Sequence, residues 1–273
     1  MTKVIPPPGL LPYSHSMTTT THNLTTVAEL AIAMPAALSV LDHLGIDYCC
    51  NGQRSVMDAC ASRGITMDEL LALIETEPKP AGERSWASAD MSAMIGFIVE
   101  THHRFTRNTL SVLPSLARKV REVHGERRPE LVSVEGLVKT VADQMLPHML
   151  KEEQVLFPYV TAMEKALKEG TEPPTPFFGT VRNPVRMMML EHETVGEVFA
   201  EIRSVTESYA LPEDACTSYR LLFERLVELE TDLHRHVHME NNILFPRALE
   251  AETRVAAPTF EVAPGACGGG CQH

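Results

Sequence analysis

Two blocks of the sequence, 88 residues apart, share the spacing H-x3-E-x3-L-F-P. The first carries His148 and Glu152, and the second carries His236 and Glu240. Because residues four apart on a helix differ by about 40° in direction, the histidine and the glutamate of each block face the same way. An imidazole or a carboxylate buried without a partner costs several kcal/mol, and a bound cation removes that cost.

Apolar residues recur at alternating steps of three and four along the chain from about residue 90 to residue 250. This spacing predicts long amphipathic helices, and no segment has the alternation of a credible strand. The predicted helices lie near residues 91–123, 131–168, 183–208 and 213–250. We therefore expect an all-α fold whose main part is a four-helix bundle.

Each of the four apolar stripes is interrupted by a histidine. His102 lies four residues after Ile98, and His192 lies three residues before Val195. These two histidines are 90 residues apart, and each sits in the helix that precedes an H-x3-E block. The bundle is thus expected to consist of two helical hairpins related by a pseudo-twofold axis, each donating two histidines and one glutamate. The predicted metal ligands are His102, His148, Glu152, His192, His236 and Glu240.

Such symmetry suits a dinuclear site bridged by two carboxylates. Ligands of nitrogen and oxygen type, without thiolate, favour iron or manganese, and zinc stays open. Other polar residues nearby point away from the bundle axis at 100° per residue. We expect four of them on the surface: His103, Glu153, His234 and His238. Glu191 and Glu193 flank His192, and either could hold an imidazole N–H.

The remaining sequence predicts smaller parts around this bundle. Short capped helices follow one another from about residue 24, and a turn with adjacent cysteines interrupts them. Pro- and Thr-rich or Gly-rich segments indicate disorder or a linker. We expect a disordered arm at 1–22, a small helical domain at 23–77, a linker at 78–88, the bundle at 89–250 and a disordered tail at 251–273.

Composition excludes several classes of protein. The chain has 24 Lys and Arg against 36 Asp and Glu, a formal net charge of −12, whereas a nucleic-acid binder needs cations for the phosphates. No stretch approaches the roughly 18 apolar residues of a membrane span, and the N-terminus lacks the pattern of a secretory signal. Six cysteines are too few for a disulfide scaffold, so we expect a cytoplasmic protein without membrane or nucleic-acid partners.

The turn at residues 46–52 contains the neighbouring pair Cys49 and Cys50. Adjacent cysteines form only a strained disulfide, and both seldom bind one tetrahedral metal. Two interpretations stay open: one buried thiol beside one idle thiol, or a reactive pair that relays iron or a nitrosyl group. Reactivity depends on the thiol pKa, which the sequence does not give.

The chain resembles the hemerythrin-like di-iron proteins of iron–sulfur cluster repair, called the RIC or ScdA-type family. The resemblance runs from about Thr25 to Leu249 and rests on Leu41-x6-Tyr48-Cys49-Cys50 and on the two blocks that end in Leu-Phe-Pro. It implies two non-haem iron ions, bridged by carboxylates and an oxo group, on the same six residues that the helical pattern selects. Where the family has Cys-Cys-Gly-Gly, this chain has Asn51 before Gly52, and we expect the turn to tolerate it.

The resemblance implies a stress-response protein that gives iron to iron–sulfur clusters damaged by nitric oxide or oxidants. Its partners would be the damaged proteins as iron acceptors, with NO or O₂ as small ligands, and a homodimer stays open. Iron donation favours a non-enzymatic role, although NO-reducing chemistry is compatible with such a centre. Two alternatives stay open: a hemerythrin-type carrier or sensor of O₂ or NO, and an interaction protein whose bundle is only a scaffold. The role of Cys267, Cys271 and His273 in the tail is open.

Overall fold

The computed structural model describes residues 25–78 and 86–256. The chain divides into two compact units, Met1–Glu83 and Arg84–His273, and we describe each by itself. The predicted arm, most of the predicted linker and most of the predicted tail lie outside the described residues.

Between residues 25 and 78, the N-terminal unit has four short helices: α2 (Val27–Ala33), α3 (Ala37–Leu44), α4 (Val56–Ala61) and α5 (Met67–Thr76). Capping boxes begin two of them, since the side chains of Thr26 and Thr66 each exchange hydrogen bonds with a glutamate three residues later. Leu30, Leu41 and Leu70 are buried between the helices and form a small apolar core.

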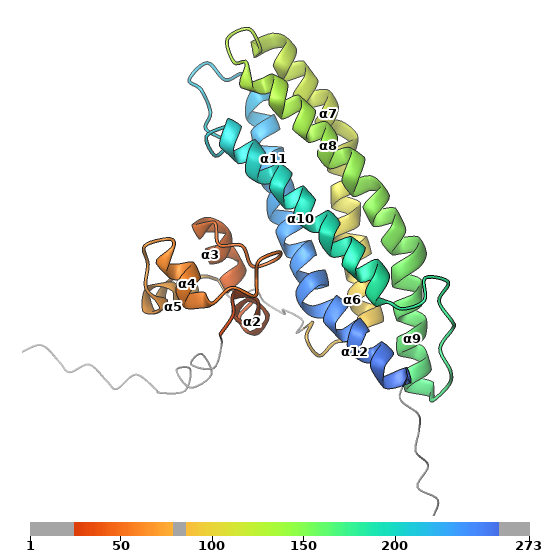
Figure 1. The fold of residues 1–273 in the computed structure, drawn as a ribbon. Helices are drawn as coiled ribbons and strands as arrows, with labels where there is room; N and C mark the ends of the chain where they lie inside the picture. The colour runs from red at the N-terminus through yellow and green to blue at the C-terminus, as the bar shows by residue number, and fades with distance from the viewer. Residues whose placement is uncertain (1–24, 79–85, 257–273) are drawn as a thin grey trace, which may run out of the picture. The chain divides into compact units, whose positions relative to one another are not determined.

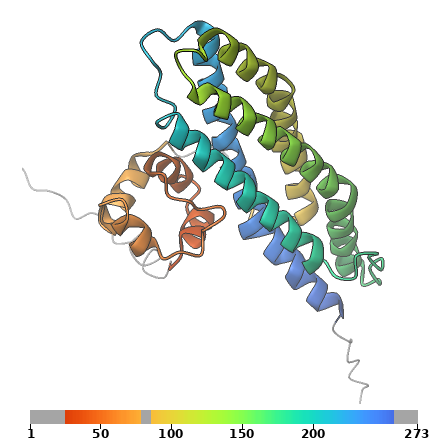
Figure 2. The ribbon, with the colours of Figure 1, turned by 45° about the horizontal axis from the view of Figure 1, so that its top comes forward.

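The C-terminal unit is a bundle of four long helical rods (Figures 1 and 2). The first rod joins α6 (Met91–Phe97), the π-helical segment η1 (Ile98–His103) and α7 (Arg104–His124). The second rod joins α8 (Glu130–Lys151), η2 (Glu152–Leu156) and α9 (Phe157–Glu169). The third rod is the single helix α10 (Arg182–Val205). The fourth rod joins α11 (Thr217–His238), η3 (Met239–Leu244) and α12 (Phe245–Ala256). The predicted all-α fold with a four-helix bundle is confirmed.

In both hairpins of the bundle, a glutamate from the end of the hairpin's second helical rod caps the start of its first rod. Glu164 in α9 accepts hydrogen bonds from the backbone N–H groups of Met91 and Ser92, at 2.7 and 3.0 Å, at the start of α6. Glu252 in α12, 88 residues after Glu164, accepts a 2.7 Å hydrogen bond from the N–H of Val181, just before α10. Each carboxylate satisfies backbone donors that a helix start leaves without an intrahelical partner. The pseudo-twofold relation therefore extends beyond the two H-x3-E blocks.

Two predicted boundaries differ from the structure. Residues 251–256 belong to α12, so the helix continues into the predicted tail. Trp86, in the predicted linker, and Ala89, the first residue of the predicted bundle, accept hydrogen bonds through their carbonyl oxygens from the guanidinium of Arg247, at 3.0 and 2.6 Å. Tertiary contacts that the local composition does not reveal thus hold both segments. Within the described residues, no helix combines the length and apolarity needed to cross a membrane.

Candidate metal centre

Two groups of buried ligand-type side chains lie at the middle of the bundle and share two members. One group contains His103, Glu152, His236 and Glu240; the other contains His148, Glu152, His192 and Glu240. In each group the ligand atoms lie within 4.8 Å of one another, and every one of these residues is buried. Each group takes one histidine from each hairpin, while both glutamates belong to both groups. Five of the six predicted residues are therefore brought together.

The sixth predicted ligand, His102, lies outside both groups, and His103 occupies the expected place in the cluster. In a regular helix of 3.6 residues per turn, His102 would follow Ile98 onto the inward face. In the structure η1 is π-helical, and the N–H of Arg104 bonds to the carbonyl of Val99, five residues earlier. One more residue fits into this turn, so His103 comes to face the axis. It is fully buried, not on the surface.

His102 lies beside the cluster without joining it. Its Nδ1 is 2.9 Å from Oδ1 of Asp232, and its ring stacks on the ring of His236 with a centroid distance of 5.6 Å and an interplanar angle of 4°. His102 thus packs against a cluster histidine and directs a nitrogen toward a different carboxylate.

The imidazoles of the cluster meet in pairs through the nitrogens that face the axis. Nε2 of His103 lies 3.1 Å from Nε2 of His236, and Nε2 of His148 lies 2.9 Å from Nε2 of His192. When the Nδ1 of a neutral imidazole donates its proton outward, Nε2 carries a lone pair. Two such lone pairs facing each other repel, and a cation between them turns the repulsion into coordination.

The shared carboxylates also lack enough partners for their charge. Neither oxygen of Glu152 has a hydrogen bond, nor does Oε2 of Glu240, and both side chains are fully buried. The contacts they do make are to the cluster imidazoles, such as 3.4 Å from Glu152 to His103 and 3.2 Å from Glu240 to His192. Because an uncompensated buried carboxylate is costly, these residues fit a site for metal cations.

Three of the four imidazoles are held from outside the cluster through Nδ1. Nδ1 of His103 is 2.7 Å from Glu153, Nδ1 of His148 is 2.8 Å from Glu191, and Nδ1 of His192 is 2.9 Å from Oδ1 of Asn241. Each acceptor fixes the tautomer whose Nε2 is free to bind a metal. Nδ1 of His236 has no hydrogen-bond partner.

These partners were only partly foreseen from the sequence. Glu191 does hold an imidazole N–H, but of His148 and not of its neighbour His192, whereas Glu193 is exposed. Glu153, expected only as a surface residue, binds His103. His238 is buried outside both groups, although it was expected on the surface. Its Nδ1 contacts the amide of Asn242 at 2.9 Å.

The Leu-Phe-Pro ending of each block also has a structural role. The ring of Phe157 stacks on His103 at a centroid distance of 5.7 Å, and the ring of Phe245 stacks on His192 at 6.1 Å. Both phenylalanines are buried, so each covers one side of a cluster imidazole with apolar surface. This packing limits ring rotation and keeps water from that side.

Electrostatics within the cluster favour charged groups. Burial by itself would lower the pKa of His148, but the carboxylate of Glu152 outweighs it and raises that pKa to about 10. Burial would raise the pKa of Glu240, but His236 and His192 hold it well below its usual range. The pKa of Glu191 falls to about 2, chiefly through its hydrogen bond to His148. The carboxylates thus stay anionic, as metal ligands must, and a metal ion that binds Nε2 of His148 would displace the proton that this raised pKa otherwise keeps on the ring.

Comparison with known proteins shows which family this chain belongs to. The model of the hemerythrin HHE cation binding domain matches residues 94–248, which include every residue of the two groups. The model of a domain of unknown function, ScdA_N (DUF542), matches residues 23–77. The iron–sulfur cluster repair protein YtfE of Musicola paradisiaca is 32% identical over 227 residues, covering 83% of this chain and 96% of that protein. The chain belongs to the ScdA-type hemerythrin family.

Further members of the family show the same relation. The proteins named iron–sulfur cluster repair protein YtfE from Yersinia pseudotuberculosis and Dickeya chrysanthemi are each 31% identical to this chain. Both alignments cover 83% of this chain and 97% of the relative. The resemblance on the Cys-Cys motif and the two H-x3-E blocks is therefore confirmed, and a metal site of the hemerythrin type agrees with the His/Glu cluster.

The predicted cysteine pair lies in the other unit, in the turn between α3 and α4. Cys49 is buried and Cys50 is half-buried, and their Sγ atoms are 3.7 Å apart. Asn51 does not need a left-handed backbone here, because it is absent from the residues with positive φ. Gly52 is required for another reason: a Cβ at that position would lie 2.6 Å from the carbonyl oxygen of Tyr48.

Proposed function

We propose that the His/Glu cluster holds two iron ions. His103 and His236 would hold one ion, His148 and His192 would hold the other, and Glu152 and Glu240 would serve both, since they belong to both groups. The observation that supports this most is the sharing of two buried carboxylates between two separate histidine pairs. A single ion would use one pair and leave the other pair of Nε2 atoms facing each other without a cation.

The donor set supports iron over other metals. Two histidines with a carboxylate and open positions are typical of non-haem iron sites, whereas structural zinc sites prefer a closed tetrahedral set, often with thiolates. The hemerythrin HHE match supports the same assignment. When bound, the ions supply redox chemistry and sites for small ligands.

The number of protein donors is low for the charge that the site carries. Each ion receives two imidazole nitrogens and one oxygen from each bridging glutamate, about four donors for a metal that commonly takes six. His236 lacks a partner at Nδ1, so the His103–His236 half of the cluster is held less firmly than the other half. A site with few donors and one weakly supported half is suited to releasing iron.

We therefore propose that this protein supplies iron to iron–sulfur clusters damaged by nitric oxide or oxidants. The relatives that carry the name of iron–sulfur cluster repair proteins support this role. In this proposal the bundle stores the iron, the acceptors are damaged iron–sulfur proteins, and Cys49 and Cys50 relay iron or a nitrosyl group.

Recovery of an iron–sulfur enzyme in cells tests the proposal. Cells that lack their own repair protein are treated with nitric oxide, and aconitase activity is followed with the wild type or a variant expressed at equal level. We expect the wild type to restore activity and His103→Ala to fail, whereas His102→Ala restores it. Equal recovery with His103→Ala and the wild type would contradict a role for the cluster in repair.

The alternative is a hemerythrin-type carrier or sensor of O₂ or NO. The incomplete coordination of both ions favours it, since open positions bind small ligands. Reversible O₂ binding by the iron-loaded protein, followed by absorption over repeated oxygenation, would support this function. A carrier of this kind would not restore aconitase in the cell assay.

A further inference from the structure

A second set of metal-binding side chains lies in the N-terminal unit, where the turn after α3 gathers two thiols and a carboxylate. Sγ of Cys49 is 3.7 Å from Sγ of Cys50 and 3.4 Å from Oδ1 of Asp47. One ligand atom from each of the three residues lies within 4.8 Å of the others. The three residues belong to one four-residue segment, 47–50, so they stay together in any arrangement of the two units.

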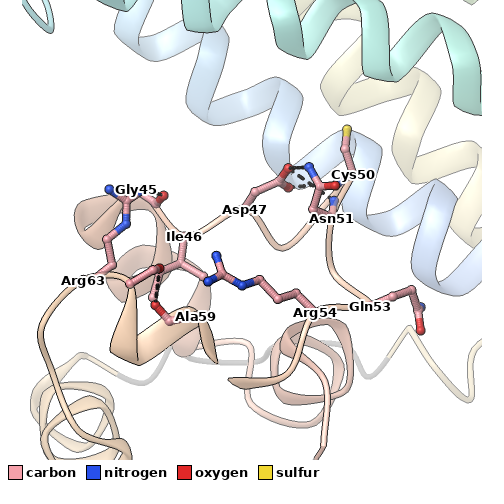
Figure 3. Close-up of a pocket in the computed structure, with 10 residues that line it drawn as sticks. Gly45, Ile46, Asp47, Cys50, Asn51, Gln53, Arg54, Ala59 and Arg63 are labelled. Carbon is pink, nitrogen blue, oxygen red and sulfur yellow. Dashed lines mark hydrogen bonds between the residues drawn. The ribbon is translucent and has the colours of Figure 1, made fainter. Parts of the chain in front are cut away.

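The turn holds these groups in place through Asp47. Oδ1 of Asp47 accepts the backbone N–H groups of Cys49 and Cys50, both at 2.9 Å. Oδ2 accepts the N–H and the side-chain amide of Asn51, at 3.2 and 2.7 Å. Figure 3 shows these hydrogen bonds between Asp47 and Asn51, with Cys50 beside them. Since the missing Cβ of Gly52 lets the chain pass close to Tyr48, the turn is tightly constrained.

The distances in this turn match one metal ion better than a disulfide. A disulfide brings two sulfurs to about 2.05 Å. Two sulfurs at about 2.3 Å from one tetrahedral ion are about 3.8 Å apart, and a sulfur and a carboxylate oxygen on such an ion are about 3.5 Å apart. The observed distances, 3.7 Å between the sulfurs of Cys49 and Cys50 and 3.4 Å between the sulfur of Cys49 and Oδ1 of Asp47, are both close to these ligand–ligand distances.

A pocket gives access to this set from solvent. Its volume is about 570 Å³, and its lining includes Asp47, Cys50, Arg54 and Arg63. In Figure 3, Asp47 and Cys50 lie at one end of the pocket and Arg63 lies at the other. The pocket leaves room for a fourth ligand, and its guanidinium groups offset the negative charge of two thiolates and a carboxylate around one divalent ion.

We propose that Asp47, Cys49 and Cys50 form a second metal site, which takes one thiophilic divalent cation of the class of Fe²⁺ or Zn²⁺. Binding replaces the two thiol protons, which leave to solvent, and forms two metal–sulfur bonds with no change of oxidation state. The thiol of Cys49 donates to Oδ1 of Asp47, and loss of this proton frees that oxygen to be the third donor. A water or a small anion from the pocket is the fourth. The use of this site to carry iron during repair rests on the proposed function, whereas the existence of the site does not.

Cobalt binding by the full-length, iron-loaded protein tests the proposal, because Co²⁺ bound by thiolates shows charge-transfer absorption in the near-ultraviolet and strong visible bands when tetrahedral. Co²⁺ is titrated into reduced protein without oxygen. We expect thiolate bands that saturate at about one Co²⁺ per chain. Bands that never appear would overturn the proposal.

Three variants locate the cobalt. Cys50→Ser, at a half-buried position, should keep the thermal stability and lose the thiolate bands. Cys216→Ser, which changes an exposed thiol in the bundle, should keep them, and a Cys267→Ser and Cys271→Ser chain should keep them too. Bands that persist unchanged in Cys50→Ser would place the cobalt elsewhere and also overturn the proposal.

The same samples separate this site from the proposed function. Iron content and aconitase recovery report on the His/Glu cluster and on repair, while the cobalt bands report only on the thiol pair. If only the second-site proposal is wrong, the cobalt bands will be absent while iron content and aconitase recovery are normal. Failure of the repair proposal alone would appear as normal cobalt bands in a protein that does not restore aconitase.

Discussion

Nε2 of His148 lies 2.9 Å from Nε2 of His192, although the two residues are 44 positions apart and belong to different hairpins. Their outward nitrogens are held by Glu191 and Asn241, at 2.8 and 2.9 Å. The pair is therefore oriented for a common ligand on the bundle axis. The second pair, His103 and His236, repeats this relation at 3.1 Å.

The choice between neighbouring histidines gives the first prediction. His103→Ala removes a cluster nitrogen, so we expect iron per chain to fall by at least half relative to the wild type. His102→Ala removes a ring that only stacks on His236, and its iron content should stay near that of the wild type. Metal analysis of both purified variants checks this. Equal loss in both would contradict the shift that the π-helical turn η1 produces.

Removal of iron should destabilise the wild type more than a carboxylate variant. In the structure, neither oxygen of the fully buried Glu152 has a hydrogen bond, although its carboxylate attracts the ring of His148. We expect the metal-free forms of Glu152→Gln and the wild type to differ in stability by about 1–3 kcal/mol at most, because the variant loses both the cost of the buried charge and its attraction to His148. Iron should stabilise the wild type strongly and the variant weakly.

Melting curves with and without a chelator measure both effects. The exposed Glu100 offers the control, because Glu100→Gln should leave the stabilisation by iron unchanged. A metal-free Glu152→Gln protein that is much less stable than the metal-free wild type would show that the carboxylate serves the fold rather than a metal.

Glu191 should matter for iron although it is not a ligand. Its carboxylate holds Nδ1 of His148, so we expect Glu191→Gln to weaken metal affinity about 10–100-fold. Glu193→Gln, two residues away on the exposed side of α10, is the matched control and should bind as the wild type does. Competition against a chelator of known affinity measures the difference. Identical iron affinities for Glu191→Gln and Glu193→Gln would contradict the expected role of Glu191 in metal binding.

The helix cap formed by Glu164 should give acid-dependent stability. Burial would raise the pKa of Glu164, but the hydrogen bonds from Ser92 and Met91 outweigh it, so that pKa lies below its ordinary value. A group with a lowered folded-state pKa stabilises the protein above its unfolded-state pKa and loses this contribution as the pH falls through the folded-state pKa. We expect Glu164→Gln to reduce the free energy of unfolding of the metal-free protein by about 1 kcal/mol at neutral pH.

Below about pH 4 this difference should shrink toward zero, because the wild-type carboxyl is then protonated as well. Urea unfolding at several pH values measures it. Glu169→Gln, at an exposed position in α9, is the control and should show a small difference at all pH values. A difference for Glu164→Gln that does not depend on pH would mean that the charge of the cap is not what stabilises the fold.

The thiol pair should be dispensable for iron storage and needed for repair. The Cys49→Ala and Cys50→Ala double variant should keep the iron of the His/Glu cluster, because every residue of that cluster belongs to the bundle. We expect it to slow aconitase recovery after nitric oxide treatment. Recovery at the wild-type rate would leave the bundle alone as the working part, and loss of iron from the His/Glu cluster would show that a thiol shapes the metal centre.

The sequence by itself determined the helical bundle, its pseudo-twofold repeat and five of the six cluster residues. These follow from local spacing: apolar residues at steps of three and four define buried faces, and His148 with Glu152, or His236 with Glu240, are one helical turn apart. Such relations depend only on the regular geometry of a helix. They need no knowledge of what packs against it.

Only the tertiary structure decided between His102 and His103, because the π-helical turn of η1 breaks the regular period on which the sequence analysis relied. It also decided the partners of the imidazoles, since Glu191 and His148 come from different helices. The approach of Cys49 and Cys50 to Asp47 depends on backbone hydrogen bonds within one turn, which spacing does not describe. Periodicity tells which residues share a face, whereas the atoms that meet across helices are set by packing and by local departures from the ideal helix.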